Sequence, residues 1–78
     1  IEIVMIIRAN ASNNEYQYSK YKPGDVFEVI NDFGEYYTAR FISGSKADDI
    51  CAVKKIDCEQ VHLGTYETKG PSTMITDD

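Results

Sequence analysis

Residues 21–44 read YKPGDVFEVINDFGEYYTARFISG, and they carry the clearest strand and turn signals of the chain. Its apolar and aromatic residues predict two strands, at 26–31 and 36–43, because such residues suit a pleated and half-buried surface. The segment NDFGE, residues 31–35, separates the two strands and carries the acidic residues and the glycine of a turn. The stretch therefore predicts two neighbouring strands that are joined by a short acidic loop.

A tight turn introduces the first of these strands. In KPGD, residues 22–25, Pro23 presets φ at the first central position of a type II turn, and Gly24 accepts the positive φ of the second. Side chains alternate between the two faces of a strand, so Phe27 and Val29 point to the same side. We expect this pair to face the core.

The rest of the chain adds three more strands around this centre. Residues 1–9 are rich in Ile and Val, and 50–57 and 61–68 are further short strand candidates. Residues 10–22 are polar and predict a long, partly ordered hairpin loop. Short strands with turn signals every eight to twelve residues are typical of an all-β barrel or small sandwich. A barrel also removes the unpaired edges of a small sheet.

The prediction is one domain, a five-stranded β-barrel over residues 1–69, followed by a flexible tail at 70–78. We expect its interior to contain these side chains: Phe27, Val29, Ala39, Ile50, Val61 and Leu63. The tail combines Gly, Pro, Ser and terminal acids, a composition typical of frayed chain ends.

The central stretch resembles a Src-homology-3 domain, in which a Lys-Gly-Asp-like turn leads into a strand, an acidic loop and an aromatic pair. The matching positions are Lys22, Gly24 and Asp25 in the turn, Phe27 and Val29 in the strand, Asp32 and Glu35 in the loop, Tyr36 and Tyr37 as the pair, and Ala39 as the small residue after it. The resemblance covers about a third of the chain at residue level, and the remainder fits only as strand order.

The resemblance implies a Src-homology-3-like barrel but gives little support for binding of proline-rich peptides. The chain has no Trp, and the opening and late motifs that supply most of the family's aromatic groove are absent. Many unrelated functions occur on this fold.

Charge and composition exclude several classes of partner. The net charge is −5, and the eight Lys and Arg residues are scattered, so direct binding of nucleic acid is disfavoured. The longest apolar run, residues 3–7, is too short to span a bilayer. We expect a cytoplasmic monomer that meets a basic surface on a partner protein, with no membrane association.

The sequence contains no motif that names a reaction, and we expect neither catalysis nor a cofactor. His62 has no Ser or Cys at informative spacing, and we interpret it as a strand-face residue. Cys51 and Cys58 are too few for a disulfide scaffold and are interpreted as reduced, partly buried thiols, with one disulfide as the alternative. The spacing C-x6-C-x3-H is unusual for zinc, and we expect no metal.

Tyrosine and carboxylate side chains form the candidate partner-binding site, because Tyr supplies rigid contact area and carboxylates pair with basic groups. The candidate residues are Glu15, Tyr16, Tyr18, Asp32, Phe33, Glu35 and Tyr36. Phe33 lies at a loop tip, where it is either exposed or folded back as a plug. The alternative interpretation is that some tyrosines cap the barrel ends and that the acids maintain solubility.

These features favour a non-catalytic protein-interaction domain. The alternative is a small acidic inhibitor, in the manner of phage-encoded proteins, that blocks a nucleic-acid-handling enzyme of the host by charge mimicry.

Overall fold

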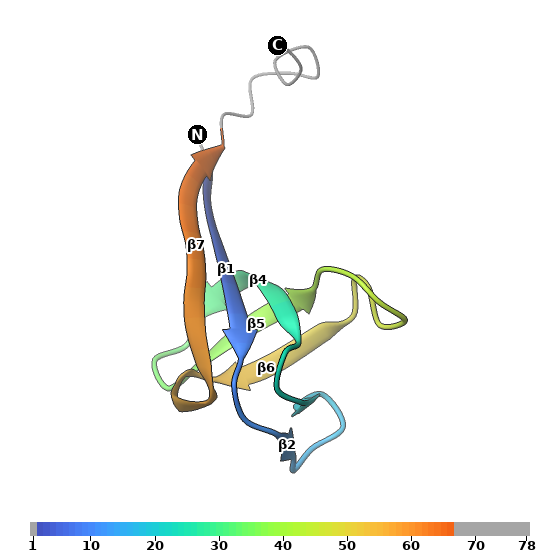
Figure 1. The fold of residues 1–78 in the computed structure, drawn as a ribbon. Helices are drawn as coiled ribbons and strands as arrows, with labels where there is room; N and C mark the ends of the chain where they lie inside the picture. Colours follow the sequence, from blue (N-terminus) through green and yellow to red (C-terminus); the bar gives the residue numbers. More distant parts are fainter. Residues whose placement is uncertain (1, 67–78) are drawn as a thin grey trace.

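The computed structural model describes residues 2–66, and the predicted tail at 70–78 lies outside this range. The described residues form β-strands and loops, with one short 3₁₀ turn, η1 (Figure 1). In chain order the elements are β1 (Glu2–Ala9), β2 (Asn13–Asn14), β3 (Lys20–Tyr21), β4 (Val26–Asp32), β5 (Tyr36–Phe41), β6 (Ile50–Lys54), η1 (Lys55–Asp57) and β7 (Cys58–Tyr66). None of the described residues belongs to a helix that is long and apolar enough to cross a membrane.

Five strands form one antiparallel sheet in the order β6-β5-β4-β1-β7, and β2 pairs with β3 in a separate hairpin. The all-β, five-stranded prediction is confirmed at this level. The turn before β4 also forms as expected, with Gly24 at φ 98° and a hydrogen bond from the Asp25 N–H to the Lys22 carbonyl.

The prediction of a closed barrel is wrong, because β6 and β7 lie at opposite ends of the sheet order and do not pair within residues 2–66. The register explains the opening. β1 pairs with β7 along its whole length but meets β4 only at Ile6, Ile7 and Arg8. The first half of β1 therefore leaves the body with the end of β7 as a two-stranded ribbon (Figure 1).

Two register shifts bend the sheet around its core, one between Ile6 and Ile7 and one between Val29 and Asn31. A bulge of this kind bends the strand and increases its local twist. The concave face packs Phe27 against Phe41, with ring centroids 4.5 Å apart, and against the edge of Tyr21. The buried apolar side chains are Ile7, Ala9, Tyr21, Phe27, Ala39, Phe41, Cys51 and Val53.

The core prediction is confirmed at Phe27 and Ala39, both fully buried, and Val29 is half-buried against them. It is wrong at Ile50, which is 47% exposed. β6 turns its other face inward, and Cys51 and Val53 fill the core instead.

Val61 and Leu63 were expected inside, and both are exposed. Leu63 lies opposite Met5, in the part of β1 that pairs with β7 but not with β4. The expected strand at 50–57 ends at Lys54, because η1 turns the chain and β7 begins at Cys58. The expected strand at 36–43 ends at Phe41.

The β2–β3 hairpin docks on the outer edge of β6. The Ala52 N–H donates to the Tyr18 carbonyl at 2.8 Å, and the Ser19 hydroxyl donates to the Ala52 carbonyl at 2.8 Å. The Asn13 amide donates to the Ser19 carbonyl at 2.6 Å and fixes the hairpin internally. Because buried backbone groups must be hydrogen-bonded, these contacts protect a strand edge that would otherwise be open.

Tyr21 ties the hairpin to η1. Its ring is buried, its hydroxyl donates to Asp57 Oδ2 at 2.6 Å, and the same hydroxyl accepts a bond from the Lys54 N–H at 3.2 Å. Burial, together with the hydrogen bond to Asp57, raises the pKa of Tyr21 well above its usual value. The phenol is therefore a neutral structural donor at physiological pH.

Tyr21→Phe should lower the free energy of unfolding by about 1–3 kcal/mol, because the substitution leaves Asp57 and the Lys54 N–H without this partner. Urea unfolding followed by circular dichroism measures the change. Tyr16→Phe is the control, since that side chain is exposed. Equal stability of the two variants would contradict this account of the hairpin.

Candidate functional site

Three tyrosines converge on one groove, which we call the tyrosine groove. Its volume is about 340 Å³, and its lining residues are Glu15, Tyr16, Tyr18, Ser19, Tyr36, Ala52 and Lys54. The hairpin forms one wall. The other wall consists of Tyr36 at the start of β5 and of Ala52 and Lys54 in the second half of β6. Tyr16 is 72% exposed, Tyr18 68% and Tyr36 40%, so all three present ring surface to solvent.

The loop after β4 is held rigidly beside this groove. The Asp32 carboxylate accepts from the Gly34 N–H at 2.8 Å and pairs with the Lys55 ammonium at 2.8 Å. The hydrogen bond from Lys55, followed by that from Gly34, lowers the pKa of Asp32. The Lys55 N–H also donates to the Glu35 carbonyl at 3.0 Å, which joins the loop to η1.

Phe33 extends the aromatic surface from this loop. Its ring stacks on Tyr36 with centroids 5.4 Å apart, and it remains 57% exposed. The Phe33 N–H donates to the Tyr36 carbonyl at 2.9 Å, so the backbone fixes the pair as well. Of the two alternatives for Phe33, the structure shows the exposed one.

Four of the residues in the predicted site line the tyrosine groove together: Glu15, Tyr16, Tyr18 and Tyr36. Phe33 joins them through its stack on Tyr36, whereas Asp32 and Glu35 lie in the adjacent loop and do not line the groove. Glu15 is paired with Lys54 at 3.1 Å. Sequence reasoning missed Ser19, Ala52 and Lys54, because no local pattern shows that the hairpin docks on β6.

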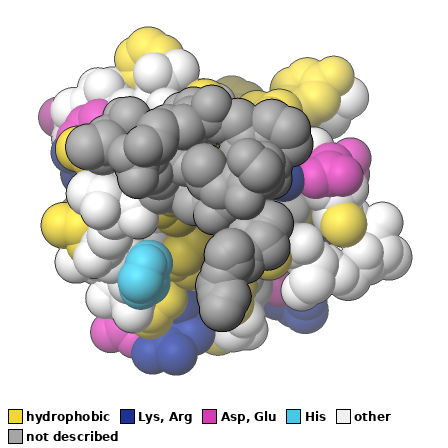
Figure 2. Space-filling model, turned by 90° about the horizontal axis from the view of Figure 1, so that it is seen from above, with side chains coloured by type: hydrophobic (Ala, Val, Ile, Leu, Met, Phe, Trp, Pro, Cys, Tyr) yellow, Lys and Arg dark blue, Asp and Glu magenta, His cyan; other side chains and the backbone are white. Residues whose placement is uncertain are grey.

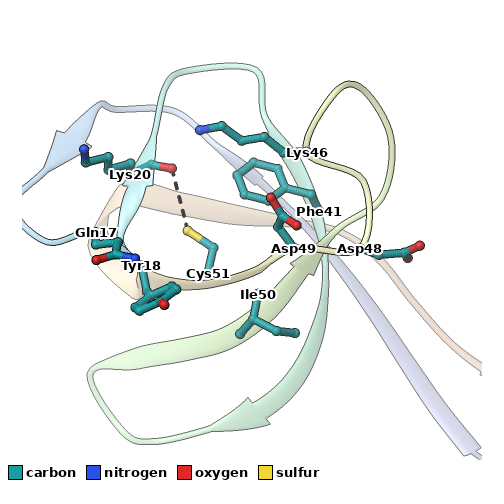
Figure 3. Close-up of a pocket in the computed structure, with 9 residues that line it drawn as sticks. All are labelled: Gln17, Tyr18, Lys20, Phe41, Lys46, Asp48, Asp49, Ile50 and Cys51. Atoms are coloured by element: carbon teal, nitrogen blue, oxygen red, sulfur yellow. Dashed lines mark hydrogen bonds between the residues drawn. The ribbon is translucent and has the colours of Figure 1, made fainter.

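A second hollow lies on the other side of Tyr18, and we call it the Cys51 pocket (Figure 3). Its volume is about 550 Å³, and its lining residues are Gln17, Tyr18, Lys20, Phe41, Lys46, Asp48, Asp49, Ile50 and Cys51. Cys51 is buried, and its Sγ lies 3.8 Å from the Lys20 carbonyl, to which the thiol donates. In Figure 3, Lys46 extends over the ring of Phe41, with its ammonium 5.4 Å from the ring centroid.

Burial raises the pKa of the Cys51 thiol to about 11, and the nearby charge of Lys46 offsets only part of this effect. Cys58 is also unpaired, and burial raises its pKa as well. Thiols with raised pKa values are weak nucleophiles, because the thiolate is the reactive form. Burial therefore keeps both cysteines mainly in the thiol form.

The one histidine of the chain, His62, is separated from Cys51 by the width of the sheet. His62 is in β7, opposite Ile6, whereas Cys51 is in β6 at the other end of the strand order. Its imidazole is exposed on the face that Figure 2 shows, and it reaches across Gly64, where an added Cβ would lie 2.9 Å from Nε2. Among residues 2–66 no three Cys, His, Asp or Glu side chains are grouped as a metal site would require.

No family model, curated protein or solved structure matches the chain. Its function is therefore inferred from the geometry of the described residues.

At pH 8 the Cys51 thiol should react with a disulfide reagent at least about a hundredfold more slowly in the folded protein than in urea. A rise of the pKa from 9 to about 11 lowers the thiolate fraction by roughly that factor. The measurement uses Cys58→Ser, so that only Cys51 reacts. Equal rates in the folded and unfolded states would contradict the burial of Cys51.

Proposed function

We propose that this chain is a non-catalytic protein-interaction domain that holds a segment of a partner protein in the tyrosine groove. The observation that carries the proposal is the convergence of Tyr16, Tyr18 and Tyr36 on one groove while their rings remain exposed. Tyrosines that served only the core would resemble Tyr21, whose ring is buried and whose hydroxyl is bonded. Tyr is also enriched among residues that dominate binding energies.

The groove is preorganised, which supports binding because less conformational entropy is lost on association. Hydrogen bonds from Ala52 and Ser19 fix the hairpin wall, and the Asp32 contacts fix the loop beside the other wall. A Tyr side chain loses few rotamers when it is covered, and its hydroxyl remains hydrated when the groove is empty.

Charge at the groove supports a partner with at least one basic residue. Glu35 directly precedes Tyr36 and makes no ion pair within residues 2–66. A Lys or Arg of the partner that reaches Glu35 would gain an exposed charge pair, which favours orientation and association rate more than affinity. Glu15 contributes less, because Lys54 already neutralises it.

We also propose that the fold is an open relative of the Src-homology-3 barrel. The residues that carry the sequence resemblance occupy positions that suit it. Phe27 and Ala39 are buried, Tyr36 lines the groove, and Tyr37 packs against the core. The groove then lies between the long polar hairpin and the acidic loop.

Charge mimicry is the less favoured alternative, because many described carboxylates already have a basic partner within the protein. Six of the acids form ion pairs with five Lys and Arg side chains, Arg40 being shared by Glu28 and Asp48: Glu15, Asp25, Glu28, Asp32, Asp48 and Glu59. An acid that is paired within the protein attracts a basic channel only weakly, since the net local charge is small.

Tyr16→Ala combined with Tyr36→Ala should abolish capture of the partner and lower the thermal midpoint only slightly, since Tyr16 is 72% exposed and Tyr36, at 40% exposed, lies outside the buried core. Peptides selected from a random displayed library against the wild-type protein provide the probe, and fluorescence anisotropy measures their affinity. Ile56→Ala is the control, because Ile56 is 87% exposed and does not line the groove. Selected peptides that bind wild type and the double variant equally would refute the site.

Raising NaCl from 50 to 500 mM should weaken this binding by less than about tenfold, because the contacts are mainly aromatic and charge pairing is limited to one or two groups. The same anisotropy assay measures the salt dependence. A fall of a thousandfold or more would instead support charge mimicry.

A further inference from the structure

Two lysines stand out when the cations of residues 2–66 are matched with their acids. Arg8, Lys22, Arg40, Lys54 and Lys55 each form an ion pair. Lys20 and Lys46 form none in the described part of the chain. Because no ion pair neutralises Lys20 or Lys46 among these residues, both ammonium charges are available to a ligand.

These two lysines line the same hollow, which we call the lysine hollow. Its volume is about 240 Å³, and its lining residues are Ser12, Asn13, Asn14, Lys20, Tyr21, Lys22, Asp25 and Lys46. It brings the β2–β3 hairpin together with the loop after β5, which carries Lys46. Figure 3 shows the neighbouring Cys51 pocket, in which the Lys46 side chain extends over Phe41 towards the strand that carries Lys20.

The one acid in the lysine hollow is already compensated. Asp25 accepts from the Lys22 ammonium at 3.0 Å through Oδ1 and from the Lys22 N–H at 3.1 Å through Oδ2. Lys20 and Lys46 also line the Cys51 pocket, where two further acids lie: Asp48, which is paired with Arg40, and Asp49. Neither of these two acids lines the lysine hollow. The charges of Lys20 and Lys46 therefore leave the lysine hollow with an excess of about two positive charges.

We propose that the lysine hollow binds a phosphate group. Two ammonium groups act as point charges that suit a tetrahedral dianion, and lysine is a common ligand for phosphate. Ser12 and Asn14 add neutral donors at the same hollow. A planar carboxylate would be matched better by the fork of an arginine, and no arginine lines this hollow.

One phosphate or pyrophosphate group fits this site better than a nucleic-acid backbone. A backbone requires cations in a row so that several phosphates are neutralised together, whereas here the two free cations line a single hollow. The site is separate from the tyrosine groove, with which it shares no lining residue. The inference is independent of the proposed function.

The test is a titration of the protein with sodium pyrophosphate at low ionic strength and pH 7.5, followed by amide chemical shifts in ¹H–¹⁵N NMR spectra. Saturable shifts are expected at residues 12–14, 20–22 and 44–47. Lys20→Gln combined with Lys46→Gln should raise the Kd by at least about fivefold, since charge-assisted contacts are lost. Both side chains are exposed, so the variant should fold normally.

Arg8→Gln combined with Lys55→Gln is the matched control, because it also removes two positive charges, and neither residue lines the lysine hollow or the tyrosine groove. Its Kd should stay within about twofold of the wild-type value. An equal loss in both variants, the absence of saturable shifts, or equally tight binding of malonate would overturn the proposal.

Two further ligands identify the source of the phosphate group. N-acetyl-phosphoserine amide represents a phosphorylated partner, and inorganic phosphate represents the free anion. Whichever of these two ligands binds more tightly than the other identifies the source of the phosphate group. If neither ligand binds and pyrophosphate does not bind either, the proposal is overturned.

Discussion

The β2–β3 hairpin is docked on the edge of β6, and this contact positions both candidate binding surfaces. Ala52 receives the hairpin through both of its backbone groups, one bonded to the Tyr18 carbonyl and the other to the Ser19 hydroxyl. These bonds satisfy an edge strand that would otherwise expose unpaired groups. They also bring Tyr21 over Phe27 and place Tyr18 between two hollows.

The same contact explains why the sheet does not close. The hairpin occupies the outer edge of β6, where a closing strand would pair, and β7 instead pairs with β1 at the other end of the sheet. A small domain buries little surface, so each hydrogen bond at this edge is a large share of its stability. The hairpin thus takes over the edge protection that closure would provide.

The sequence correctly predicts those elements that depend on neighbouring residues alone. The turn at 22–25 and the burial of Phe27 and Ala39 follow from turn chemistry and from alternation along a strand. Alternation fails at Ile50 and Cys51, because both faces of β6 carry apolar residues and the pattern does not say which faces inward. Closure and the end of β6 at η1 depend on contacts between distant segments, which no local pattern encodes.

Part of the candidate site could likewise be predicted from the sequence, and part of it only from the structure. The tyrosines and Phe33 could be proposed from sequence because exposed aromatic residues in polar loops are unusual. Their wall partners Ser19 and Ala52, and the meeting of Lys20 with Lys46 across 26 residues, follow only from the docked hairpin. The tyrosine groove and the lysine hollow are therefore both formed by the docked hairpin, one on each side of it.

Hydrogen exchange at the Ala52 amide tests the docking most directly. If the Ala52 N–H is bonded to the Tyr18 carbonyl, its exchange should be about as slow as that of Ala39 inside the sheet. Exchange of Ala52 at the rate of an exposed loop amide, while Ala39 remains protected, would show that the hairpin is not docked and would contradict the account of both surfaces.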